Sequence, residues 1–147
     1  MTESTSPSEP FETITQGGRR KAYRPLPDAE RRTAIEAGLE AYARDDWFLA
    51  HELLEPAWMG TRDIAERELL QGLIKLAAAF VHGARGNPAG VEKNLRGARK
   101  RLAVAGSDTD GERLGVEVKA LLAAIDERLV RPIELGDPAI PVGRSGR

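Results

Sequence analysis

One run of the chain, D-D-W-F-L-A-H-E-L-L-E-P-A-W, gathers the residue types that could do chemistry. In a helix with about 100° per residue, His51 and Glu55 share one face. Trp47 and Trp58 frame this pair at either end, and Glu52 points about 100° away from His51. A histidine and a glutamate on an aromatic face need partners, because burying them unpaired costs several kcal/mol.

The spacing H-E-x-x-E is one residue type away from H-E-x-x-H, the helical motif of zinc-dependent proteases. By that analogy His51 and Glu55 would bind a divalent metal such as zinc, and Glu52 would be the general base of a metal-dependent hydrolase. A third ligand has no obvious source in the sequence. A cation such as Arg67 facing Glu55 would also oppose metal binding.

The next helical segment offers partners of a different kind. If the two segments form a hairpin reflected about residue 61, Glu55 lies opposite Arg67, His51 lies opposite Gln71, and Trp47 lies opposite Lys75. We therefore expect an ion pair in the first case and a hydrogen bond in the second. Such a cluster is either a satisfied polar core or the lining of a small-molecule or anion pocket. Its members would be Trp47, His51, Glu55, Trp58, Arg67 and Gln71.

The second histidine, His82, lies about 16 Å further along its helix axis than Gln71. We therefore expect it not to reach His51 within one subunit. In a symmetric homodimer it could meet a site of the second copy, although no feature of the sequence requires such a dimer.

Three runs together resemble a known family. They are H-E-L-L-E-P-A-W (51–58), R-E-L-L-Q-G-L-I-K-L-A-A-A-F-V-H (67–82) and G-N-P-A-G (86–90). They are similar to domain of unknown function family 309, whose small all-α members carry an H-E-x-x-E-x-x-W signature. The resemblance covers roughly residues 33–102 and implies a compact multihelical bundle. The family's label of predicted metal-dependent hydrolase implies the activity described above but no established reaction.

Helices must position these residues. Asp28, Asp46 and Asn87 are candidate helix caps, Pro88 suits a first turn, and Gly86 suits a helix end. A proline inside the second segment, Pro56, predicts a kink or an end near Glu55.

The run L-L-Q-G-L-I-K-L-A-A-A-F-V is apolar almost all round and is typical of a central helix. We predict an all-α, five-helix antiparallel bundle over residues 28–130. The expected helices are 28–44, 47–58, 63–85, 88–105 and 110–130.

Composition limits the remaining possibilities. The 147-residue chain suits one domain, and its lack of cysteine excludes disulfides and thiolate chemistry. Residues 1–27 lack periodicity and are expected to form a disordered arm, and residues 131–147 a Pro/Gly-rich tail. No apolar run approaches the roughly 18 residues of a membrane span, so no membrane partner is expected. Arg19-Arg20 is not followed by an apolar export segment, which favours a cytoplasmic protein.

A basic run follows Val91. It consists of Lys93, Arg96, Arg99, Lys100 and Arg101. Such a run is typical of a solvated helix face, and it has no interleaved aromatic residue to stack bases. The net charge of −1 also gives no argument for nucleic acid. A third interpretation remains a helical interaction module that dimerises or binds an acidic partner through this face.

Overall fold

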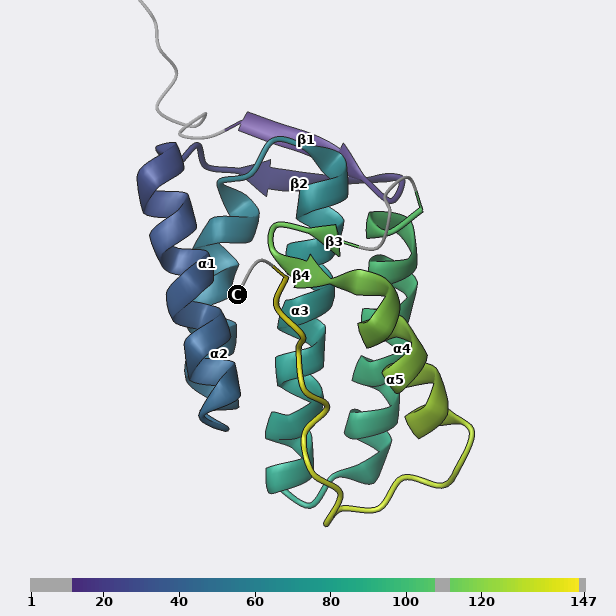
Figure 1. Ribbon diagram of the computed structural model, residues 1–147. Coiled ribbons are helices and arrows are strands. Elements are labelled where there is room, and N and C mark those ends of the chain that lie inside the picture. The colour runs from purple at the N-terminus through teal and green to yellow at the C-terminus, as the bar shows by residue number, and fades with distance from the viewer. Residues whose placement is uncertain (1–11, 108–111, 146–147) are drawn as a thin grey trace, which may run out of the picture.

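Five helices make up most of the computed structural model, which describes residues 12–107 and 112–145. Each helix packs mainly against its neighbours in the sequence, and α3 lies in the middle of the bundle (Figure 1). The predicted all-α class is confirmed, with two small two-stranded sheets added to it. No helix in the described part of the chain is long and apolar enough to cross a membrane. The helices are α1 (Asp28–Ala43), α2 (Trp47–Met59), α3 (Ile64–Ala84), α4 (Pro88–Ala105) and α5 (Val118–Leu129).

Most helix boundaries follow from local capping. The side chains of Asp46, Asp63 and Asn87 accept hydrogen bonds from backbone N–H groups in the first turns of α2, α3 and α4. Gly86 takes the left-handed conformation (φ +74°) after α3. The prediction for α1 differs in one point: Pro27 occupies the cap position without a side-chain cap, and Asp28 is the first helical residue.

Helix α2 does not end near Glu55, which was one of the two outcomes predicted for Pro56, but continues through the proline to Met59, one residue beyond the expected end at residue 58. Pro56 still accepts a hydrogen bond from the N–H of Gly60 at 2.9 Å, so the ladder loses only the donor that proline lacks. Leu54 and Ala57 on either side of the proline are buried, and this burial offsets the lost hydrogen bond.

The predicted disordered arm is instead a β-hairpin over residues 12–23. Strands β1 (Glu12–Gln16) and β2 (Arg19–Tyr23) pair antiparallel across one end of the helices (Figure 1). The turn residues Gly17 and Gly18 have φ values of +60° and +78°. A two-residue type I′ turn requires this conformation, and glycine adopts it without strain. The N–H of Arg24 donates to the carbonyl of Met59 at 2.9 Å and ties the hairpin's end to α2. Residues 1–11 of the expected arm lie outside the described residues.

Helix α5 begins at Val118, later than the predicted start near residue 110. Two short strands precede it, β3 (Glu112–Arg113) and β4 (Val116–Glu117), joined by a turn in which Leu114 and Gly115 have positive φ. The predicted tail returns along the bundle (Figure 1). The hydroxyl of Tyr42 donates to the carbonyl of Ile140 at 2.6 Å. Ile140 itself is buried, so this segment belongs to the core.

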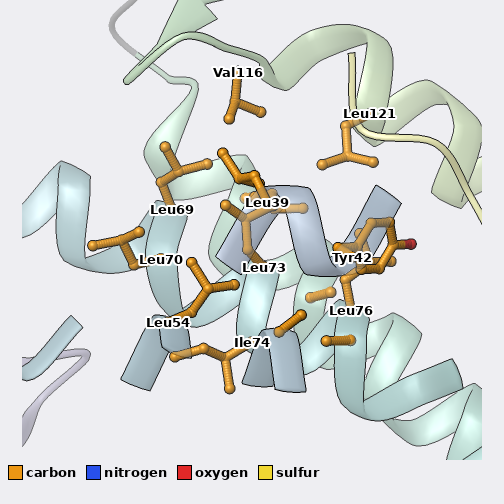
Figure 2. Close-up of a cluster of buried hydrophobic side chains, with 14 of the residues drawn as sticks. Leu39, Tyr42, Leu54, Leu69, Leu70, Leu73, Ile74, Leu76, Val116 and Leu121 are labelled. Atoms are coloured by element: carbon orange, nitrogen blue, oxygen red, sulfur yellow. The ribbon is translucent and has the colours of Figure 1, made fainter. Parts of the chain in front are cut away.

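The core centres on α3, which is buried on most of its sides. Figure 2 shows Leu69, Leu73 and Leu76 of α3 with Leu54 of α2 and Leu121 of α5, all buried. Where α3 meets α4, a Cβ added to Gly72 would lie 2.7 Å from Cγ of Leu102. Leucine branches therefore fill the space that a side chain at position 72 would need.

This contact gives a stability prediction within a single helix. Gly72→Ala should lower the free energy of unfolding by about 1–3 kcal/mol, because Leu102 is buried and cannot move aside. Gly83→Ala is the matched control, since its added Cβ would meet only Cγ2 of Val91, at 3.5 Å. It should be neutral or stabilise by up to about 1 kcal/mol. Urea denaturation of both variants measures the difference, and equal stabilities would contradict the tight contact at Gly72.

Candidate functional site

Arg67, near the start of α3, is fully buried. Its Nη1 donates to the carbonyls of Thr61 at 2.9 Å and Trp58 at 3.2 Å, and its Nη2 donates to the carbonyl of Ala22 at 3.3 Å. Its Nε donates to Oε1 of Gln16 at 3.1 Å. Burial lowers the pKa of Arg67, but arginine starts so far above neutral pH that the side chain keeps its charge. The carbonyls at the C-terminal end of α2 carry the partial negative charge that balances it.

Gln16, at the end of β1, connects the residues around Arg67. Its Oε1 also accepts a hydrogen bond from Nε1 of Trp58 at 3.1 Å, and its Nε2 donates to Oε1 of Gln71 at 2.8 Å. The Arg67 guanidinium lies over the Trp58 ring, 5.2 Å from its centroid. We call these four residues, Gln16, Trp58, Arg67 and Gln71, the Gln16 cluster. They form a satisfied polar core rather than a pocket.

The predicted ion pair between Glu55 and Arg67 is therefore wrong, and so is the predicted hydrogen bond between His51 and Gln71. Gln16 is instead the side chain that bonds to both Arg67 and Gln71. The prediction missed it because the hairpin that carries Gln16 was expected to be disordered. The register of α2 against α3 also differs. The Trp47 ring packs on Phe80, with centroids 5.9 Å apart, whereas the predicted reflection placed it opposite Lys75. The contact between Trp47 and Phe80 corresponds to a reflection about residues 63–64 instead of residue 61.

The shifted register brings both histidines to one hollow. His51 of α2 and His82 of α3 line a depression of about 160 Å³ in one subunit, so the expectation that they stay apart is wrong. We call it the histidine hollow. Its lining is Phe48, His51, Ala78, Val81, His82 and Arg85. A larger cavity of about 350 Å³ lies between α1 and the C-terminal segment and contains none of the predicted site residues.

The hydrogen bonds of Asn87 determine the tautomer of His82. Oδ1 of Asn87 accepts from the N–H of Gly90 at 3.1 Å, so its Nδ2 is the atom that faces Nδ1 of His82, also at 3.1 Å. An amide nitrogen only donates, and Nδ1 must therefore accept. In neutral His82 the proton is then on Nε2, which makes this atom a hydrogen-bond donor.

His51 is held less firmly. Its Nδ1 is buried and has no hydrogen-bond partner among the described residues. The nearest carboxylate oxygen is Oε2 of Glu52 at 3.6 Å, and that glutamate side chain is 54% exposed. The indole Nε1 of Trp47 is likewise buried without a hydrogen-bond partner in the described structure.

The donor set does not fit the metal site that the H-E-x-x-E analogy implied. Across residues 12–107 and 112–145, no group of three or more histidine, aspartate or glutamate side chains is placed to hold a metal ion. His51 and Glu55 thus lack a third protein ligand. The Arg85 guanidinium in the lining of the histidine hollow would also repel a cation.

A comparison with family models agrees with the resemblance that the H-E-x-x-E-x-x-W run indicates. The model of a domain of unknown function, DUF309, matches residues 35–99, from within α1 to within α4. The match confirms the family resemblance of this chain, and that family has no assigned function. No curated protein matches the sequence.

The Gln16 cluster predicts which substitution destabilises the fold. Gln16→Ala would leave Nε of Arg67, Nε1 of Trp58 and Oε1 of Gln71 without their partner. The substitution should lower the free energy of unfolding by about 2–4 kcal/mol, because a buried donor or acceptor without a hydrogen-bond partner destabilises the folded state. Urea denaturation measures the change, and faster tryptic cleavage between Arg19 and Lys21 would report release of the hairpin.

Glu55→Ala is the control that separates this arrangement from the predicted ion pair. Because Arg67 binds neutral acceptors instead, removing the Glu55 carboxylate should cost less than about 1 kcal/mol. A loss of about 3–5 kcal/mol would mean that Glu55 does neutralise a buried Arg67, and the Gln16 cluster would then be incorrect.

Proposed function

We propose that this helical domain binds a small carboxylate-bearing molecule in the histidine hollow. One observation carries the proposal: two imidazoles and one guanidinium line the same depression as apolar side chains. A ligand site of this composition offers a few directional polar groups on a mainly apolar surface. Of the predicted ligand pocket only His51 lines the hollow. The other predicted members, Trp47, Glu55, Trp58, Arg67 and Gln71, are not in its lining.

Arg85 supplies the charge for such a ligand. Its guanidinium forms no ion pair with any carboxylate of the described residues, whereas Arg96, Arg99 and Arg131 each pair with one. A guanidinium presents parallel N–H groups that match the two oxygens of a carboxylate. Nε2 of His82 can add a further hydrogen bond, because its proton is held there by Asn87.

The apolar part of the hollow suits a compact organic group. Ala78 and Val81 contribute methyl groups from α3, and the Phe48 ring, 57% exposed, lies on the α2 side. A cavity of about 150 Å³ accommodates benzene. The hollow has about the same volume, so a six-membered ring bearing one carboxylate matches both its size and its polarity.

The imidazole signals of the two histidines allow a direct test. Benzoate is titrated into the ¹⁵N-labelled full-length protein, and the side-chain resonances are followed by NMR, with His82→Gln used to assign them. We expect a saturable shift of both histidines. Arg85→Gln should weaken binding by about tenfold or more, because the ligand loses its charge-assisted contact. Arg32→Gln, which removes an exposed positive charge from α1, should leave the affinity unchanged.

Benzyl alcohol, a neutral molecule of nearly the same size, tests the charge requirement. Equal shifts with benzyl alcohol would mean that only an apolar surface is present and would overturn the proposal. The absence of any shift up to about 10 mM benzoate, equivalent to a binding free energy weaker than about −3 kcal/mol, would overturn it as well.

A further inference from the structure

A second group of charges lies where the hairpin meets α3 and α4. Lys21 comes from β2, Lys75 from α3 and Arg101 from α4. We call these three residues the cationic corner. The one carboxylate among them is Glu68, which is buried and accepts hydrogen bonds from Nη1 of Arg101 through both oxygens, at 3.2 and 3.4 Å. The carboxylate is therefore already used, and the two lysines remain unneutralised.

Lys75 is the least compensated of these cations. It is half-buried and forms no ion pair or hydrogen bond with the described residues. Burial lowers its pKa, and repulsion from three neighbouring cations, foremost Arg101, lowers it further. Burial and Arg101 lower the pKa of Lys21 in the same way, and Glu68 is the single carboxylate that raises it. Like charges held together in a partly buried place oppose one another, and an anion relieves that cost.

Two glycines leave room for these cations. A Cβ added to Gly97 of α4 would lie 2.9 Å from Cδ of Lys75, so the lysine stem lies directly on the helix backbone. A Cβ added to Gly17 in the hairpin turn would lie 2.9 Å from Nη1 of Arg101. Both cationic side chains are thus held against backbone rather than extended freely into solvent. The corner is preformed by three separate elements of the fold.

The neighbouring basic residues of α4 limit how far this charge extends. Arg96 pairs with Glu92 at 2.9 Å, and Arg99 pairs with Asp126 of α5. Arg96 and Arg99 are therefore neutralised within the fold, whereas Lys93, which adds to the repulsion that lowers the pKa of Lys75, and Lys100 form no ion pair with a described residue. The two paired arginines interrupt the positive charge along α4, so it does not form a continuous track of the kind that follows a nucleic-acid backbone.

We infer that the cationic corner binds the phosphate group of a small phosphorylated molecule through Lys21, Lys75 and Arg101. A phosphate monoester carries about −1.5 to −2 charges at neutral pH, which matches the two unneutralised lysines. Nε and Nη2 of Arg101 are not used by Glu68 and can donate to phosphate oxygens. This site is independent of the histidine hollow, since the two have no lining residue in common.

Isothermal titration calorimetry with the full chain tests the inference, using pyrophosphate and phenyl phosphate as probes at constant ionic strength. We expect both to bind. Lys75→Gln and Lys21→Gln should each weaken binding by about tenfold or more. Lys119→Gln removes an exposed lysine of α5 and should not change the affinity. Far-UV circular dichroism confirms that each variant is folded, and Lys21 on the hairpin gives a second reading if the substitution at Lys75 disturbs α3.

Three results would overturn the inference. The first is no heat of binding with either probe. The second is equal weakening by Lys119→Gln, which would indicate a general effect of charge. The third is tighter binding of a single-stranded oligothymidylate than of pyrophosphate, with a steep dependence on salt, which would identify a nucleic-acid surface instead. Benzoate titrated alongside should leave the pyrophosphate affinity unchanged, so failure here is distinguishable from failure at the histidine hollow.

Discussion

Hydrogen bonding of one buried guanidinium constrains much of this structure. Arg67 has no solvent exposure, and a buried arginine must find acceptors for its five N–H groups in one small region. Its acceptors are carbonyls at the end of α2 and in the following turn, a carbonyl of β2 and the amide of Gln16. These segments must all be in place before the charge is satisfied. The arginine therefore couples the α2–α3 turn to a hairpin that lies far away in the sequence.

This coupling also explains how the H-E-x-x-E-x-x-W run is used. Trp58 contributes a ring face and an indole N–H to the Gln16 cluster, while His51, two turns earlier on α2, lies in the lining of the histidine hollow. Residues that looked like one site thus belong to two places with different physical roles. The acceptors for Arg67 are neutral, so Glu55 is not required for its charge. Glu52 remains largely exposed beside His51.

Sequence reasoning succeeded where the signal is local. Asp63, Asn87 and Gly86 mark helix boundaries through their own side chains or φ preference, and these boundaries are confirmed. It failed where the outcome depends on distant parts of the chain. Strands β1 and β2 are largely exposed, so they lack a clean apolar alternation, and the Gly17-Gly18 pair was the one available hairpin signal. The helix pairing was misplaced because a reflection about the turn takes no account of side-chain packing, which here places Trp47 against Phe80 instead of Lys75.

The packing of α4 on α3 shows why the two proposed sites are separable. A Cβ at Gly90 would lie 2.6 Å from the His82 ring, just as one at Gly97 would meet Lys75. The two glycines are seven residues apart on α4, and His82 and Lys75 are seven residues apart on α3, so in this antiparallel contact each of these two side chains lies over a glycine. His82 and Lys75 are then about 10 Å apart along the α3 axis. The lining of the histidine hollow falls wholly within the DUF309 match at residues 35–99, whereas the cationic corner also needs Lys21 and Arg101 from outside it. A chain with this domain but without the hairpin would keep the first site and lose the second.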